Sequence, residues 1–146
     1  MVRQFLVAML LCCASVAAIA TDSPVGVWRT IDDKSGKEKS LVRITEVQGE
    51  LRGTIEKLFR APGEDPNPNC DKCPGEKKGK PVIGMTILTG LKRTGDEYAG
   101  GEILDPANGK VYRCKMWTSD GGKKLNVRGF IGVSVLGRTQ VWVREE

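Results

Sequence analysis

Short segments with strand-like patterning dominate the chain from about residue 25 onward. In each segment apolar side chains alternate with polar ones, or β-branched residues follow one another, and Gly, Asn, Asp or Pro closes the segment. A period of two favours strands over helices. The pattern predicts eight strands, at residues 25–32, 39–47, 51–58, 82–93, 97–104, 110–118, 124–132 and 138–145.

Most of the connections between these segments have the composition of tight turns. Gly, Asn, Asp and Ser accept a positive φ or bond to their own backbone, and they fill the connections at 33–36, 48–50, 94–96, 105–109 and 120–122. Eight antiparallel strands either close into a barrel or leave two exposed edges, and closure removes the edges. We therefore predict an all-β fold, an eight-stranded antiparallel up-and-down barrel.

The two ends of this strand series carry the clearest sign of closure. Trp28 lies in the first predicted strand and Arg144 in the last. The first and last strands of a closed barrel are neighbours, so the Arg144 guanidinium can stack on the Trp28 ring with a cation–π attraction of about 0.5 to 2 kcal/mol. We expect this pair to close one end of the barrel.

Residues 59–81 interrupt the rhythm with five prolines and no apolar period. A structureless connection of this length is usually functional or disordered, and it is the expected place for a lid. Cys70 and Cys73 lie inside it, and their C-x-x-C spacing predicts a disulfide in an exported protein. A redox pair or a metal site are the alternatives, although the motif lies at no helix N-terminus. Pairing of either cysteine with Cys114 also stays open.

The first residues predict export. Arg3 supplies a positive start, residues 5–16 an apolar stretch, and Ala18-Ile19-Ala20 a small-x-small cleavage signal. We expect residues 1–20 to be a signal peptide cleaved after Ala20, and residues 21–146 to be one periplasmic or secreted domain. The apolar stretch is shorter than the roughly 20 residues of a membrane span, so no membrane anchor is predicted.

Composition removes several classes of function. The chain has a formal net charge of +5 and only 5% aromatic residues, so it offers no stacking platform, and nucleic acid is not an expected partner. It contains no histidine, the usual general base and the usual transition-metal ligand. We expect no catalytic residue, no cofactor and no metal site.

A closed eight-stranded barrel has an interior that can hold one small ligand. The candidates for inward-facing positions are of modest size: Ile55, Met85, Ile103, Cys114, Val127 and Val141. Tyr112, Arg138 and Met85 are the candidate ligand-binding residues, and the expected partner is a small, partly apolar ligand. In the alternatives, the barrel is filled by its own side chains, or an envelope interaction or stress protein docks a protein or peptidoglycan through the 59–81 loop or its outer surface.

A set of motifs in a fixed order adds a resemblance to these inferences. Gly26-Val27-Trp28 with Asp32-Asp33 comes first, followed by residues 70–73, 81–84, 100–112, 127–132 and 137–144. Together they resemble the exported bacterial family known as domain of unknown function 2147. The G-x-W start and the Arg after the last Trp resemble the lipocalin and calycin signature. The resemblance implies a calycin-like barrel and no established activity.

Overall fold

The computed structural model describes residues 23–145. The predicted signal peptide, its cleavage site and the start of the predicted mature domain lie outside the described residues.

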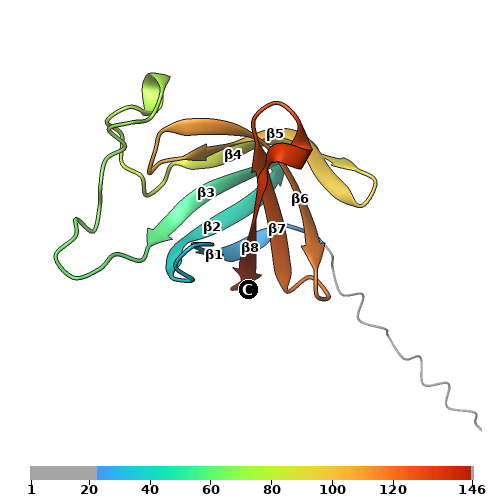
Figure 1. Ribbon diagram of the computed structural model, residues 1–146, viewed down its shortest axis with the longest axis horizontal. Coiled ribbons are helices and arrows are strands. Elements are labelled where there is room, and N and C mark those ends of the chain that lie inside the picture. Colours follow the sequence, from blue (N-terminus) through green and yellow to red (C-terminus); the bar gives the residue numbers. More distant parts are fainter. Residues whose placement is uncertain (1–22, 146) are drawn as a thin grey trace, which may run out of the picture.

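The described chain forms a closed barrel of eight antiparallel strands in up-and-down order (Figure 1). Each strand pairs with the next along the chain, and β1 also pairs with β8, where Trp28 lies opposite Arg144. The predicted fold is therefore confirmed. The strands are β1 (Gly26–Ile31), β2 (Glu38–Val47), β3 (Glu50–Leu58), β4 (Thr86–Thr94), β5 (Glu97–Asp105), β6 (Lys110–Ser119), β7 (Lys124–Phe130) and β8 (Arg138–Arg144).

The main departure from the predicted strands lies before β4. The prediction that a strand begins at residue 82 is wrong, because residues 82–85 form a turn in which Gly84 has a φ of 89°. The apolar side chains of Val82 and Met85, which suggested a strand, are instead buried beneath the preceding loop. The connection between β3 and β4 thus runs from 59 to 85 and includes a short 3₁₀ helix, η1 (Gly75–Lys77).

The barrel interior follows the alternation of each strand. On β2, Ser40, Val42 and Ile44 are buried while the residues between them are more exposed. Val141 was expected to face inward, but its side chain points outward and is 42% exposed. Gln140 and the buried Trp142 occupy the inner face of β8, so the period of two turns residue 141 outward.

One end of the barrel is closed by Trp28 and Arg144. Trp28 is fully buried, and its indole N–H donates to the Pro24 carbonyl at 2.7 Å. The Arg144 guanidinium lies 4.2 Å from the Trp28 ring centroid and donates to the carbonyls of Gly122, Val25 and Ser23 at 2.7, 3.0 and 2.7 Å. One side chain therefore joins β8 to the β6–β7 turn and to the segment before β1. Burial lowers the pKa of Arg144 from its usual value.

Candidate functional site

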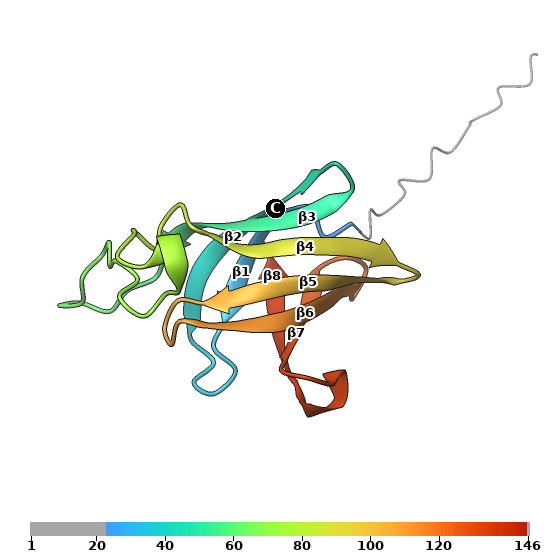
Figure 2. The ribbon, with the colours of Figure 1, turned by 90° about the horizontal axis from the view of Figure 1, so that it is seen from above.

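The opposite end of the barrel contains a cavity of about 610 Å³. The β1–β2, β3–β4, β5–β6 and β7–β8 connections all lie at this end, because consecutive strands run antiparallel. In Figure 2 the 59–85 loop extends to the left of the strands, and the β7–β8 loop projects below them. Both loops contribute residues to the cavity wall, so the cavity lies partly inside the barrel and partly between its loops.

The deeper walls of the cavity are mainly apolar. They are formed by inward side chains of five strands: Ile55, Ile87, Ile103, Val127 and Trp142. Gly129 leaves a bare stretch of wall beside them. A Cβ built at Gly129 would lie 3.5 Å from Tyr112 Cβ and 3.7 Å from Ile103 Cγ2, which are ordinary contacts. The glycine therefore leaves space that a larger side chain would occupy.

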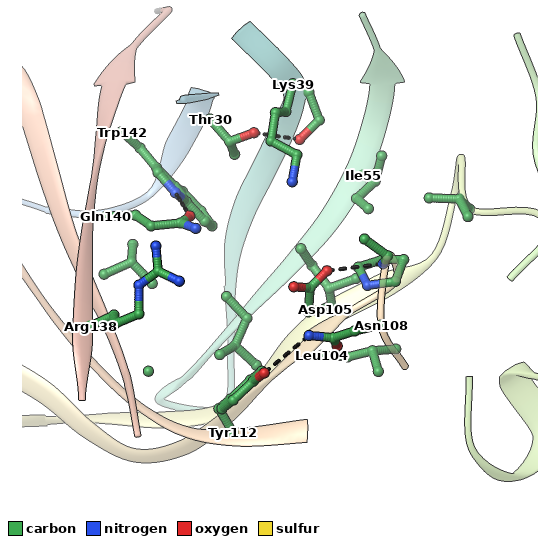
Figure 3. Close-up of a pocket in the computed structure, with 18 of the residues that line it drawn as sticks. Thr30, Lys39, Ile55, Leu104, Asp105, Asn108, Tyr112, Arg138, Gln140 and Trp142 are labelled. Atoms are coloured by element: carbon green, nitrogen blue, oxygen red, sulfur yellow. Dashed lines mark hydrogen bonds between the residues drawn. The ribbon is translucent and has the colours of Figure 1, made fainter. Parts of the chain in front are cut away.

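Three hydrogen-bonded pairs place polar atoms on this surface (Figure 3). The Thr30 and Ser40 hydroxyls are 2.7 Å apart and buried. The Asn108 amide donates to the Tyr112 hydroxyl at 3.1 Å, and the Trp142 indole N–H donates to the Gln140 amide oxygen at 3.2 Å. The Tyr112 hydroxyl proton and the Gln140 amide hydrogens are further donors that a ligand can use.

Charged side chains form the rim of the cavity, where they are open to solvent. Arg138 pairs with Asp33, Lys39 lies 3.9 Å from Asp32, and Arg60 lies 3.1 Å from the Glu64 carboxylate. The Ser35 backbone N–H donates to Asp32 and holds the pKa of that carboxyl below its usual value. Exposed pairs of this kind add little stability.

The 59–85 loop is a docked wall of the cavity. The disulfide predicted between Cys70 and Cys73 is present, and both residues are buried. Cys70 Sγ lies 3.4 Å from the Pro106 carbonyl oxygen on the β5–β6 turn. On the same turn, a Cβ at Gly109 would lie only 1.8 Å from the Lys72 carbonyl oxygen, so the two backbones touch. The loop adds Phe59, Arg60, Pro68, Asn69 and Val82 to the cavity lining.

The structure brings together two of the three residues predicted to contact a ligand. Tyr112 and Arg138 line the cavity. Met85 is not among the lining residues, because it is buried beneath the loop with its sulfur 4.0 Å from Cys73 Sγ. Sequence reasoning missed Gln140 and Trp142, although both share the alternation of Arg138 on β8. It also missed Gly129, because the space beside this glycine is bounded by Tyr112 on β6 and Ile103 on β5.

The residues that line the cavity include no cysteine. Cys114 is the free cysteine of residues 23–145, and it lies buried in the core away from the cavity. Burial raises the pKa of the Cys114 thiol to about 12, which suppresses the reactive thiolate. Within the described range no three His, Cys, Asp or Glu side chains are grouped to hold a metal ion.

Comparison with known proteins supports the architecture. No curated protein sequence matches the chain. The structure of protein HP1028 from Helicobacter pylori, described as belonging to the lipocalin family, is similar with a TM-score of 0.73. The match covers 86% of this chain and 85% of that one at 20% sequence identity. It therefore shows a shared fold. The family model of uncharacterized proteins conserved in bacteria, DUF2147, matches residues 26–144, and the chain belongs to that family.

Proposed function

We propose that this protein is an exported, non-catalytic binding protein that holds one small, partly apolar ligand in the cavity at the open end of its barrel. The observation that carries the proposal is the cavity itself. Its volume of about 610 Å³ falls within the roughly 300–1,000 Å³ range of ligand pockets, which combine apolar walls with a few placed polar groups. A lipocalin-like fold is compatible with this use.

The chemistry of the lining indicates how such a ligand is oriented. Its apolar part fits against Ile55, Val127 and Trp142 in the barrel. Its polar end fits near the rim, where Tyr112 and Arg138 offer hydrogen-bond donors.

In residues 23–145 no helix is long and apolar enough to cross a membrane.

Two measurements test the proposal. Native mass spectrometry of protein purified after export should reveal an added mass that disappears on denaturation without reduction. Titration with N-phenyl-1-naphthylamine, a neutral apolar fluorophore, should show saturable binding by protein from which that mass has been removed. A bare native mass combined with no saturable fluorophore binding overturns the proposal and favours partner docking through the 59–85 loop.

A cavity-filling variant localises the binding. Gly129→Leu adds an apolar side chain where the structure has room for a Cβ and open cavity beyond it. We expect at least a tenfold loss of fluorophore affinity, about 1.4 kcal/mol, with the fold retained. Val141→Leu is the control, because it adds apolar volume on the outer face of β8. Equal effects of the two substitutions would place the fluorophore outside the barrel.

A further inference from the structure

The β7–β8 loop exposes apolar side chains far more than any other part of the described chain. Ile131, Val133, Val135 and Leu136 are 67%, 58%, 81% and 78% exposed. The other exposed large apolar residues are 40–43% exposed and lie on the outer surface of strands or beside β1. Four such residues within six positions form a patch that solvent does not favour. We call residues 131–136 the apolar tip.

The apolar tip is held in place by a side chain beneath it. The Arg128 guanidinium donates to the Ser134 carbonyl at 2.8 Å and to the Val135 carbonyl at 3.4 Å. It also donates to the Thr139 hydroxyl at 2.8 Å, which ties the loop to β8. Gly137 closes the loop, since a Cβ there would lie 2.6 Å from the Gly129 carbonyl oxygen. The exposure is therefore part of an ordered conformation.

These hydrogen bonds also affect what the tip can enter. An unbonded carbonyl is costly to bury in an apolar medium. The Ser134 and Val135 carbonyls already accept from Arg128, and the Val133 carbonyl accepts from the Leu136 N–H at 3.1 Å. Three of the six carbonyls of the tip are thus already hydrogen-bonded beneath its apolar side chains, which lowers the cost of leaving water.

Basic side chains predominate on the strands that lead to the tip. Residues 110–115 and 127–138, which include the parts of β6, β7 and β8 nearest the open end, contain five Lys and Arg residues and no acidic residue. Arg138 directly follows the loop; it pairs with Asp33 and keeps 61% of its side chain exposed. Arg113 lies over the Phe130 ring that precedes the loop. The strand surface beside the tip therefore attracts anions.

From these observations we infer that the apolar tip inserts into an anionic lipid bilayer, while the basic residues beside it contact the headgroups. Surface-bound elements use this combination of buried apolar side chains and cationic neighbours. A second protein surface fits less well, because a stable interface takes about 20–30 residues a side and the tip offers four apolar ones on a projecting loop (Figure 2).

The position of the tip adds a consequence that rests on the proposed function. Ile131 and Leu136 also line the cavity. Insertion of the tip brings the cavity mouth to the bilayer surface. A partly apolar ligand then passes between bilayer and barrel without crossing water.

Vesicle sedimentation tests the inference directly. The purified protein should sediment with vesicles that contain phosphatidylglycerol, and much less with vesicles of phosphatidylcholine alone. Added salt should weaken the binding through screening of the basic residues. The double variant Val133→Ser, Val135→Ser should lose about tenfold or more of its vesicle binding, because both exposed apolar side chains are removed from the tip.

A matched control separates the tip from general surface hydrophobicity. Val141→Ser, Val143→Ser removes two apolar side chains from the outer face of β8, which are 42% and 43% exposed, and should leave vesicle binding unchanged. Thermal denaturation should show that both double variants keep the fold. Absence of vesicle binding by the unmodified protein, or equal losses in the two variants, overturns the inference. So does a tip-dependent dimer seen by light scattering in place of vesicle binding.

The outcome is independent of the binding proposal. Fluorophore titration in the absence of vesicles reports only on the cavity. The tip variant should retain that binding within about twofold, because neither Val133 nor Val135 lines the cavity. Vesicle binding without fluorophore binding would leave the docking intact and remove only the ligand-exchange consequence.

Discussion

The two ends of the barrel are built on opposite plans. At the closed end, a fully buried Trp28 and a guanidinium bonded to three backbone carbonyls fill the space between the strands. At the open end, the same strands surround a cavity of about 610 Å³, and the polar side chains pair on its surface. A cavity forfeits packing contacts. We infer that the packing at the closed end offsets the contacts that the cavity at the open end lacks.

The largest expected effect comes from removing the buried ring at the closed end. Trp28→Ala should reduce the free energy of unfolding by about 3–5 kcal/mol, because it leaves a large cavity in a fully packed site. Urea denaturation followed by circular dichroism measures this loss. The counterpart at the open end is Tyr112→Ala, which removes a half-buried ring that already borders a cavity and should cost about 1 kcal/mol. Equal losses would refute the contrast between the ends.

A second contrast compares Arg144 at the closed end with Arg138 at the open end, because each joins its strand to another element. Arg144→Lys should cost about 2–3 kcal/mol, because an ammonium cannot reproduce three hydrogen bonds to separate carbonyls, two of them part-buried, and leaves acceptors unpaired. Arg138→Lys at the open rim should change stability by less than about 0.5 kcal/mol, since its pair with Asp33 is exposed. The same denaturation experiment measures both. A larger loss of unfolding free energy in the Arg138 variant would mean that the pairs at the rim stabilise the fold.

The alternation of apolar and polar residues predicted all eight strands, because each strand has one face in the barrel interior. Trp28 and Arg144 pointed to the closed end for the same local reason, since the first and last strands must meet. The cavity required more. Which side chains reach it depends on Gly129, Tyr112 and Ile103, which come from three different strands.

Sequence reasoning failed where apolar residues serve a purpose other than a strand face. Val82 and Met85 resemble the start of a strand but are buried beneath the 59–85 loop, and an apolar run alone does not separate these cases. The predicted strand at 124–132 included residues 131 and 132, and no structure was predicted for residues 133–136, so the exposure of this segment was not anticipated. A net charge taken over the whole chain also concealed the excess of basic residues after residue 109.

The disulfide offers a way to weaken the open end alone. The double variant Cys70→Ser, Cys73→Ser should lower stability by about 2 kcal/mol, the loop-closure estimate for so short a ring. Because the cysteines lie against the β5–β6 turn, undocking of the loop should also reduce fluorophore affinity. Treatment of the unmodified protein with a thiol reductant should reproduce both effects. Unchanged affinity in the variant would show that the loop stays docked without its disulfide.

The smallest expected effect concerns the core between the two ends and depends on pH. Burial raises the pKa of the Cys114 thiol from 9.0 to about 12, so the unfolded chain releases this proton at a lower pH than the folded chain. Stability contributed by the neutral thiol is fully present below pH 9.0 and is lost progressively toward pH 12. Between pH 8 and pH 10 the free energy of unfolding should fall by about 1.4 kcal/mol from this group. The Cys114→Ala variant provides the reference, because other groups titrate equally in both proteins. If the two proteins lose stability in parallel over this range, the Cys114 thiol titrates as readily in the folded chain as in the unfolded one. Water would then reach Cys114 despite its 1% exposure, and the tightly packed region would extend less far from Trp28.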